Sequence, residues 1–200
     1  GRVHPMTIRD SEQVKGFIDA CWQHYGRLDI LVNNAGGQFP QAAIDFAVKG
    51  WNAVIDTNLN GPWYMMQAAA KCWRDAGQPG SIVNIVAVVW RGMPGVAHTC
   101  AARAGVIYLS KTLAIEWAPY KIRVNCVAPG VIETEGMDVY PPDARADFPR
   151  SNPMLRMGDV QDVADACCYL GGATGKFNTG ETVTVDGGNQ LWGEQWTAGR

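Results

Sequence analysis

Residues 28–36 read LDILVNNAG, and this stretch decides the fold of the chain. It starts as a short continuous apolar run, which is typical of a parallel strand that is buried on both faces. Polar residues and a glycine end the run, and an amphipathic pattern of helical period follows over residues 49–75. We therefore expect a buried strand followed by a helix, with residues 33–36 at the carboxyl end of the strand.

The same alternation of apolar run and helical pattern continues along the chain. Strands are predicted near residues 29–33, 81–87, 122–127 and 182–186. Helices are predicted over residues 11–25 (with Ser11 as the cap), 49–75, 98–118 and 160–171. Strands separated by helices of this length imply a parallel sheet with right-handed crossovers. The predicted fold class is therefore α/β, a doubly wound parallel sheet with helices on both faces.

Composition and charge exclude several classes of protein. The 200 residues are 47% hydrophobic and 18% charged, with a net charge of −2, which suits one globular domain and excludes a disordered chain. Acids and bases are interspersed, so we expect no nucleic-acid partner and no anionic membrane surface as a partner. No apolar run approaches the ~18 residues of a membrane span, and residues 1–10 do not resemble a signal peptide.

The six cysteines and three histidines show no spacing typical of a disulfide framework or a metal site. Cys167 and Cys168 are adjacent within an apolar helical run, where free cysteine behaves as a small hydrophobic residue. We therefore expect reduced thiols in a cytoplasmic protein, and no bound metal. A metal or redox site is the less favoured alternative.

The ligand of an open parallel sheet lies beyond the carboxyl ends of its strands. That rule points to residues 33–36, 86–95, 129–136 and 186–188. Glycine at a strand end lets the backbone approach a dinucleotide, and a Pro-Gly pair aims backbone amides and carbonyls into the crevice. Residues 135–156 form one long, proline-rich interruption at the same edge, which we interpret as a lid.

At these strand ends the chain resembles the short-chain dehydrogenase/reductase superfamily, from about residue 5 to residue 192. NNAG closes the first strand, DTNLNGPW contains the position of the family's active-site asparagine, and RVNCVAPGVIET and TGETVTVDGG match its last two strands. The resemblance implies a Rossmann-like doubly wound sheet and a nicotinamide cofactor, NADPH or NADH. The cofactor-binding residues that it implies are Asn34, Ala35, Gly36, Arg103, Pro129, Gly130, Ile132 and Thr134.

The family's first βαβα unit has no counterpart in these residues. That unit carries a T-G-x-x-x-G-x-G loop, which binds the pyrophosphate at a helix N-terminus. The resemblance therefore implies that residues 1–200 are the C-terminal three quarters of one domain, either as a fragment of a longer protein or as a natural truncation. Residues 1–10 look like the family's third strand, with residues 7–10 near the adenine, although the family's strand order leaves that strand without a neighbour.

The catalytic positions depart from the family's pattern. In the Y-x-x-x-K motif, Thr99 stands at the tyrosine position and Arg103 at the lysine position. The usual serine is replaced by Ala87 or Val86, and Asn58 alone is retained. A threonine hydroxyl is far less acidic than a phenol, whose pKa is ~10, whereas an arginine stays charged and can hold ribose hydroxyls. The catalytic residues that the resemblance implies are therefore Asn58, Thr99 and Arg103.

This set of residues lacks an acid for ketone reduction, which needs a proton at the oxygen as hydride arrives. Reduction of a C=C bond conjugated to a thioester does not need an acid at the oxygen, because hydrogen-bond donors can stabilise an enolate on the thioester oxygen. Residues 84–134 also look like the peroxisomal trans-2-enoyl-CoA reductase branch, which uses NADPH. We therefore expect a reductase of 2-enoyl-CoA thioesters. The alternatives are a dehydrogenase of carbonyl or alcohol substrates, such as a 3-ketoacyl reductase, and a non-catalytic Rossmann-like subunit.

Three neighbours of the catalytic positions carry weaker expectations. Ile107 stands where the peroxisomal branch has a tyrosine donor, so that assignment does not carry over. Tyr108 lies ~140° around the helix from Arg103, and we interpret it as a packing or interface residue. His98 is expected to point elsewhere on the helix, which makes a proton relay to Thr99 the less favoured interpretation.

Trp90 and Arg91 follow a strand at the mouth of the predicted cleft and are weak candidates for substrate contact, Arg91 with a CoA phosphate. For Trp90, covering the core is an equally favoured interpretation. The helices at 49–75 and 98–118 carry more apolar positions than one sheet face needs, and the resembling family pairs these two helices across a dimer axis. We therefore expect a homodimer or homotetramer. The apolar positions behind this expectation are Trp63, Met65, Met66, Ile107, Tyr108 and Leu113.

Overall fold

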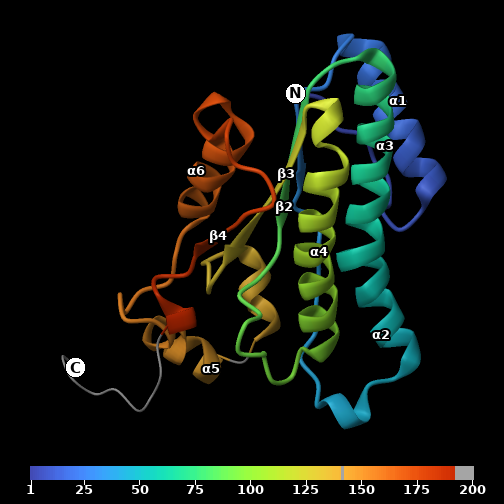
Figure 1. Cartoon of the computed structure of the whole chain (residues 1–200). Helices are drawn as coiled ribbons and strands as arrows, with labels where there is room; N and C mark the ends of the chain where they lie inside the picture. Colours follow the sequence, from blue (N-terminus) through green and yellow to red (C-terminus); the bar gives the residue numbers. More distant parts are fainter. Residues whose placement is uncertain (141, 192–200) are drawn as a thin grey trace.

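A four-stranded parallel sheet forms the centre of the molecule, as Figure 1 shows for the computed structural model. The structure describes residues 1–140 and 142–191, so residues 192–200 of the predicted domain and residue 141 of the predicted lid lie outside the described residues. Each strand pairs in parallel with its neighbour, in the order β1 (Ile30–Asn33), β2 (Gly80–Ile85), β3 (Ile122–Pro129) and β4 (Thr182–Val185). The predicted fold class and its four strands are confirmed.

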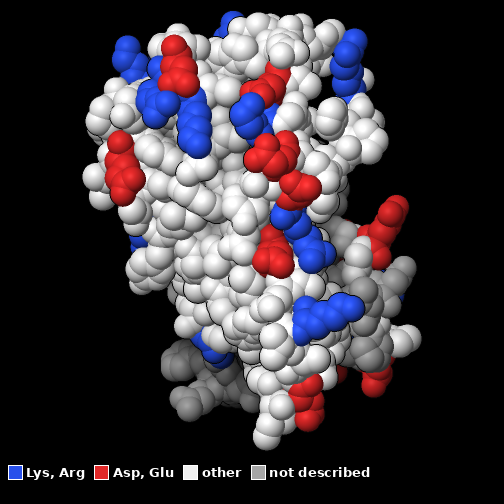
Figure 2. All heavy atoms as spheres, turned by 90° about the vertical axis from the view of Figure 1, so that its right-hand side faces the viewer, with Lys and Arg blue, Asp and Glu red and all other residues white. Residues whose placement is uncertain are grey.

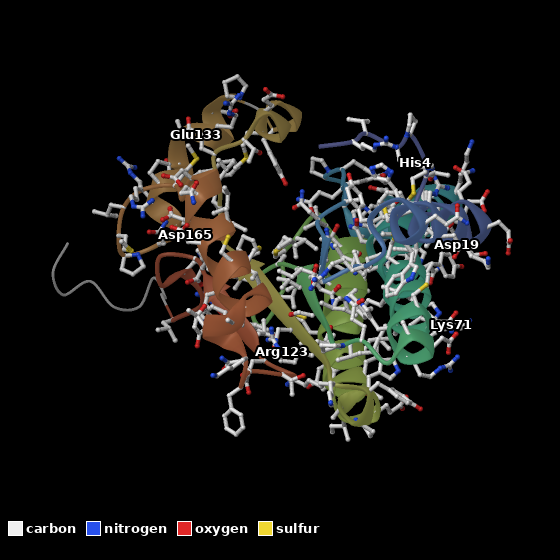
Figure 3. All side chains as sticks on the ribbon, turned by 90° about the horizontal axis from the view of Figure 1, so that it is seen from above. His4, Asp19, Lys71, Arg123, Glu133 and Asp165 are labelled. Atoms are coloured by element: carbon white, nitrogen blue, oxygen red, sulfur yellow. The ribbon has the colours of Figure 1, made fainter. Side chains whose placement is uncertain are left out.

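Helices cover both faces of the sheet, as predicted (Figures 1 and 3). The two that pack on one face are α3 (Gly61–Ala76) and α4 (Ala97–Glu116), while α6 (Val160–Gly171) packs on the other. Outside this core, α1 (Ser11–Tyr25) packs on α3, α2 (Val48–Ile55) precedes α3, and α5 (Pro142–Asp147) lies in the segment predicted as a lid. Short 3₁₀ turns occupy Ala43–Asp45, Ala118–Tyr120, Glu135–Val139, Phe148–Ser151, Ala173–Gly175 and Asn189–Leu191.

The chain that enters α1 differs from the prediction in two respects. Asp10 caps the helix instead of Ser11, because its carboxylate accepts hydrogen bonds from two backbone N–H groups of the first turn, at 2.9 and 3.2 Å. Residues 1–10 form no strand, because no neighbouring strand offers them backbone hydrogen-bonding partners. Ile8 instead packs against the start of α3.

The prediction that β1 is buried on both faces is wrong. Leu31 is 6% exposed, but Ile30 and Val32, which point to the opposite face, are 42% and 45% exposed. On that face the end of α6 lies beside β1, where Gly171 is next to Ile30, but α6 packs more extensively against β2, β3 and β4 than against β1. The apolar residues of this strand therefore lie on two different faces, one of them buried and the other partly exposed.

The long helix predicted over residues 49–75 is interrupted in its middle. It consists of α2, a π-helical turn at Asp56–Asn60, and α3, all with helical backbone angles. A π turn widens the helix locally and is found mostly at functional sites. Here the turn carries Asn58, whose side chain is buried, with 1% of its surface exposed.

Most of the residues that predicted an oligomer interface lie in the core of the monomer instead. Met65, Met66, Ile107 and Leu113 are buried. Because α1 packs on the outside of α3 and α2 contacts α4, more than one face of each long helix is covered within the monomer. Of the predicted positions, Tyr108 is exposed (71%) and Trp63 is partly buried.

Charges of both signs are mixed on the molecular face that Figure 2 shows, which is the side of α1, α2 and α3 in Figure 1. Acidic and basic side chains lie next to one another there, and several form ion pairs such as Lys15 with Asp19 at 2.7 Å. Among residues 1–140 and 142–191, none of the helices combines the length and the apolar character needed to span a bilayer.

Candidate active site

A cavity of about 1660 Å³ opens at the carboxyl ends of the strands, where the sequence predicts a ligand. Each of the predicted segments 33–36, 86–95 and 129–136 contributes some residues to its lining, the first of them Asn34 alone. Asn189, also in the lining, lies just beyond the fourth predicted segment. The predicted cofactor-binding residues found in the lining are Asn34, Arg103, Pro129, Gly130, Ile132 and Thr134. Ala35 and Gly36 lie in the exposed loop that follows β1.

Gly36 brings three of the predicted site residues together. A Cβ atom at this position would overlap Arg103 Nη2 and would lie 3.2 Å from Asn58 Oδ1. The loop after β1 therefore rests directly on the guanidinium of Arg103 from α4 and on the amide of Asn58 from the π turn. A side chain at position 36 would displace the guanidinium of Arg103 from its present position.

Asn58 holds this loop through both of its polar atoms. Its Oδ1 accepts a hydrogen bond from the backbone N–H of Gly37 at 3.0 Å, and its Nδ2 donates to the carbonyl of Gly37 at 2.8 Å. Because both groups bind the same residue, Asn58 fixes the position of the NNAG loop over α4.

Arg103 is a buried cation in the lining of the cavity. Its side chain is largely enclosed, with the residue 8% exposed, and Nη1 donates to the carbonyl of Ile85 at 3.0 Å. Among the described residues, no carboxylate lies within ion-pair distance of it. Burial lowers the pKa of Arg103 to about 10, so the group remains charged at neutral pH. An uncompensated positive charge at the wall of a cavity favours a negatively charged ligand group.

Thr99 lines the cavity and is 3% exposed, and His98 lies against it. His98 Nδ1 accepts a hydrogen bond from the backbone N–H of Thr99 at 2.8 Å and lies 3.4 Å from its Oγ1. The prediction that His98 points elsewhere is wrong, because the first N–H groups of a helix need acceptors and this ring supplies one.

His98 is nevertheless poorly suited to a proton relay. Its ring is enclosed by Phe39 and Phe46, with centroid distances of 4.7 and 4.5 Å. Burial lowers the pKa of His98, so the ring is neutral at pH 7. A neutral ring whose Nδ1 is an acceptor has no proton on the atom that faces Thr99.

The remaining predicted residues are distributed between the wall and the mouth of the cavity. Val86 and Ala87 line the wall and offer no hydroxyl group, so the serine of the family pattern has no replacement at either position. Arg91 also lines the cavity, and its Nη1 donates to the carbonyl of Asn189 at 3.3 Å. Trp90 is 45% exposed beside Arg91 and is not among the described lining residues.

Gly130 has a structural reason to be glycine that is independent of any ligand. A Cβ there would lie 2.8 Å from the Cα of Asp186, in the turn that follows β4. Two strand ends therefore pack closely at this point, and the Pro-Gly pair serves the sheet as well as the lining of the cavity.

The segment predicted as a lid lies over the cavity, and its side chains reach the lining. Tyr140 and Phe148 are both lining residues and pack edge to face, with ring centroids 5.4 Å apart. Gln38, in the loop after β1, donates a hydrogen bond from Nε2 to the hydroxyl of Tyr140 at 2.6 Å. This bond joins two segments that are far apart in the sequence.

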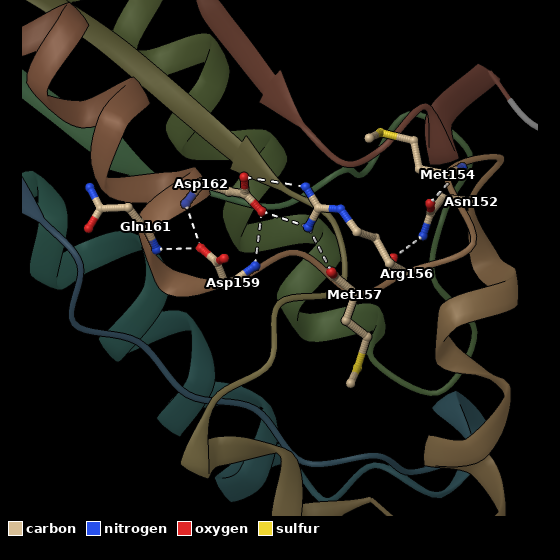
Figure 4. Close-up of polar contacts among 7 residues, drawn as sticks. All are labelled: Asn152, Met154, Arg156, Met157, Asp159, Gln161 and Asp162. Carbon is tan, nitrogen blue, oxygen red and sulfur yellow. Dashed lines mark hydrogen bonds and ion pairs between the residues drawn. The ribbon is translucent and has the colours of Figure 1, made fainter.

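The end of the lid segment is anchored to α6, as Figure 4 shows. Arg156 donates to the carboxylate of Asp162 at 2.9 Å and to the carbonyl of Met157 at 3.0 Å. The hydrogen bond from Arg156 holds the pKa of Asp162 below its usual value. Asp159 and Asp162 form a capping box at the start of the helix. The lid therefore ends at a fixed point beside the sheet.

The chain is similar to known proteins over almost its whole length. A family model described as enoyl-(acyl carrier protein) reductase matches residues 1–190. The chain is 38% identical over 191 residues to a protein of Bacillus subtilis (strain 168) named as a probable 2,4-dienoyl-CoA reductase, a match that covers 93% of this chain and 75% of the relative. The chain belongs to the short-chain dehydrogenase/reductase superfamily.

Other members of the superfamily are similar over the same region. A 3-oxoacyl-[acyl-carrier-protein] reductase FabG of Thermotoga maritima is 37% identical over 191 residues, which cover 94% of this chain and 77% of that protein. The solved structure of ElxO with NADP bound is 30% identical and has a TM-score of 0.88, over 94% of this chain and 78% of the other. The chain thus spans about three quarters of the length of these relatives.

The superfamily and its oxidoreductase class were predicted from the sequence and are confirmed. The structure also shows two residues that the sequence reasoning did not single out, Gln38 and Tyr140. Gln38 directly follows the NNAGG run, and Tyr140 is the aromatic residue nearest the start of the predicted lid. Their positions beside the NNAG motif and in the predicted lid could have indicated that both residues line the cavity. The contact between their side chains could not be inferred from sequence spacing.

Proposed function

We propose that the full-length protein is an NADPH-dependent reductase of the C=C bond in 2-enoyl-CoA thioesters. The observation that carries this proposal is the buried guanidinium of Arg103 in a cavity whose helix position 99 bears threonine in place of the family's tyrosine. A fixed cation suits a reaction in which negative charge develops on a thioester oxygen.

The residues at the strand ends fit a nicotinamide cofactor. Gly36 has no side chain and lies on Arg103, so a ribose could approach both the loop backbone and the guanidinium. Residues proposed to hold the cofactor are Asn34, Ala35, Gly36, Arg103, Pro129, Gly130, Ile132 and Thr134. When bound, the cofactor supplies a hydride. The NADP-bound structure of ElxO, which is 30% identical, supports NADPH over NADH.

The chain's own residues favour an enoyl substrate over a ketone. Thr99 can donate a hydrogen bond to an enolate oxygen but is a poor acid for an alkoxide. Arg103 adds positive potential to the same region of the cavity. Asn58 contributes by fixing the loop that faces the substrate, since both of its polar atoms bind Gly37.

A second candidate is reduction of a 3-ketoacyl thioester. The FabG relative of Thermotoga maritima is named for that reaction and is 37% identical, almost the same identity as the dienoyl-CoA reductase relative. Both candidates reduce an acyl thioester with the same cofactor. They differ in the bond that is reduced and, by the names of the two relatives, in the carrier of the acyl group, which is CoA in one and acyl carrier protein in the other.

The experiment that separates them uses the full-length protein with NADPH and two CoA thioesters of equal chain length. We expect a larger kcat/KM for the 2-enoyl-CoA than for the 3-ketoacyl-CoA. A preference for the ketone would replace the first candidate by the second. No oxidation of NADPH with either thioester would favour a non-catalytic subunit.

We also propose a homodimer or homotetramer and a cytoplasmic location. The exposed apolar side chains of Tyr108 and Ile115 on α4, 71% and 79% exposed, support self-association through that helix. The six cysteines are unpaired, which is typical of proteins in a reducing compartment.

A further inference from the structure

We propose that Tyr140 is the acid of the reaction, and that its phenol gives the reduced substrate the proton that Thr99 is too weak an acid to supply. This inference rests on the proposed function, because it requires an acyl thioester substrate that gains a hydride. It assigns the acid to residues 135–156, outside the helix where the family's motif is found.

Three observations support this role for Tyr140. The side chain lines the cavity that Thr99 and Arg103 also line. Its ring is held edge to face against Phe148, at a centroid distance of 5.4 Å. Its oxygen accepts a hydrogen bond from Gln38 Nε2 at 2.6 Å. Because that bond occupies a lone pair of the oxygen, the O–H hydrogen remains available to a molecule in the cavity.

The rest of the described lining offers little acid chemistry. It contains no carboxyl, imidazole or ammonium group, and its other titratable side chains are Arg91, Arg103, Arg150, Cys167 and Cys168. Arginines keep their protons at neutral pH. The two thiols lie on α6, which covers the face of the sheet opposite to α4, and burial raises the pKa of Cys167. Tyr140 is therefore the described lining group best placed to act as the acid.

The proton and the electrons balance in a single two-electron reduction. The substrate accepts a hydride at one carbon, and the π electron pair moves through the conjugated system to the thioester oxygen. The O–H bond of Tyr140 then breaks, and its proton forms a C–H bond at the α-carbon as the enolate returns to a thioester. The bonding pair stays on the phenol oxygen, and solvent water restores the proton.

Gln38 is a positioning residue for this phenol. Its N–H group stabilises negative charge that develops on the phenol oxygen as the proton leaves. Gln38 directly follows Gly37, whose N–H and carbonyl groups are both bound by Asn58. The side chain that orients Tyr140 therefore projects from a loop that Asn58 holds in place.

The test compares Tyr140→Phe with Tyr120→Phe in the full-length protein, with NADPH and a 2-enoyl-CoA. Tyr140→Phe keeps the ring and its contact with Phe148 but removes the hydroxyl. Tyr120 is the matched control, because it is 46% exposed in the turn before β3 and does not line the cavity. We expect Tyr140→Phe to lower kcat by roughly 10²–10³-fold, with KM for the thioester and the calorimetric Kd of NADPH changed by less than about 3-fold.

A second variant tests the positioning residue. Gln38→Met removes the donor to the phenol and keeps a side chain of similar length. We expect kcat to fall by about 10-fold, the lower end of what the loss of one hydrogen bond to a charged group costs. Thermal unfolding of both variants is measured alongside, and we expect transitions within about 3 °C of wild type, since neither change removes buried apolar area.

Three results would overturn the inference. The first is a Tyr140→Phe enzyme whose kcat is within about 2-fold of wild type. The second is a rise in KM with unchanged kcat, because the hydroxyl would then only bind substrate or hold the lid. The third is a larger loss of kcat in Cys167→Ala than in Tyr140→Phe, which would assign the acid to that thiol. Wild-type protein inactive with every thioester would overturn the proposed function itself, together with this inference.

Discussion

Gly36 lies against the guanidinium of Arg103 so closely that a Cβ atom at position 36 would overlap Nη2. This contact joins the carboxyl end of β1 to the middle of α4. It places beneath the loop that is proposed to hold the cofactor a buried cation with no carboxylate partner among residues 1–140 and 142–191. The contact explains why the loop needs a glycine at this position and why the next glycine serves a different purpose. Gly37 has open space around its Cβ position and bonds to Asn58 through its backbone.

The first prediction compares these two glycines. Gly36→Ala should displace the Arg103 side chain and weaken NADPH binding by about 10-fold or more, because a displaced cation no longer meets the ribose. Gly37→Ala should change the Kd by less than about 2-fold, since the added methyl group meets no atom and the backbone bonds persist. Calorimetric titration measures the Kd of NADPH for the two variants. Equal losses of affinity would show that the Gly36–Arg103 contact does not determine cofactor binding.

Arg103 should lower the stability of the folded protein while it strengthens the binding of NADPH. Burial lowers the pKa of Arg103 to about 10, so burying the charged guanidinium costs folding free energy at every pH below that value. Arg103→Met should therefore leave the free energy of unfolding at pH 7 unchanged or raise it, by up to roughly 3 kcal/mol. The same variant should lose NADPH binding by at least about 10-fold, because the fixed cation is gone.

Urea unfolding and calorimetric titration of Arg103→Met measure the two quantities. The sign follows from proton linkage. The unfolded chain keeps the proton to higher pH than the folded chain, so the contribution of Arg103 to wild-type stability should rise as the pH increases above about 10. A strong loss of stability in Arg103→Met at pH 7 would mean that the hydrogen bond to the carbonyl of Ile85 outweighs the desolvation of the charge.

His98 should make the protein sensitive to acid. Burial among Phe39 and Phe46 lowers the pKa of His98. Below about pH 6.5 the imidazole is therefore protonated more readily in the unfolded chain than in the folded protein. Stability from this group is therefore present at neutral pH and lost as pH falls, with a limiting slope of ~1.4 kcal/mol per pH unit. His98→Gln should unfold at a lower temperature at pH 7 but show a weaker decline between pH 7 and pH 5.

The control for His98 is the exposed residue His24, near the end of α1. His24→Gln should leave the decline of the unfolding temperature between pH 7 and pH 5 as it is in wild type. If both variants decline like wild type, the acid sensitivity arises from other groups and the buried ring of His98 is not its source.

Self-association should depend on the exposed apolar side chains of α4. Ile115→Glu combined with Tyr108→Glu should convert the full-length protein to a monomer in light scattering at micromolar concentration, because charges are costly in an apolar interface. The control is Tyr25→Glu at the end of α1, which is 56% exposed on a different helix. A wild-type protein that is already monomeric would contradict the predicted oligomer.

Much of the fold could be predicted from local patterns alone. The apolar runs at β1, β2, β3 and β4 and the helical periodicity between them require only that each segment bury its apolar positions, and alternating segments of this length admit few arrangements. The burial of β1 was predicted incorrectly for a related reason. An apolar run shows that a strand can be covered on both faces, but whether a helix reaches it depends on the path of α6.

The sequence by itself determined the superfamily, the parallel sheet, the edge at which the cavity opens, and the departures at positions 99 and 103. Those properties follow from residue types and from spacings within one segment. The tertiary structure alone decided that Gly36 rests on Arg103, that Asn58 binds Gly37 through both polar atoms, and that Gln38 meets Tyr140. Each of these contacts joins segments that are distant in the chain. Whether the segments meet depends on how closely the helices pack on the sheet, and that packing is precise to a fraction of an ångström, which no local pattern encodes.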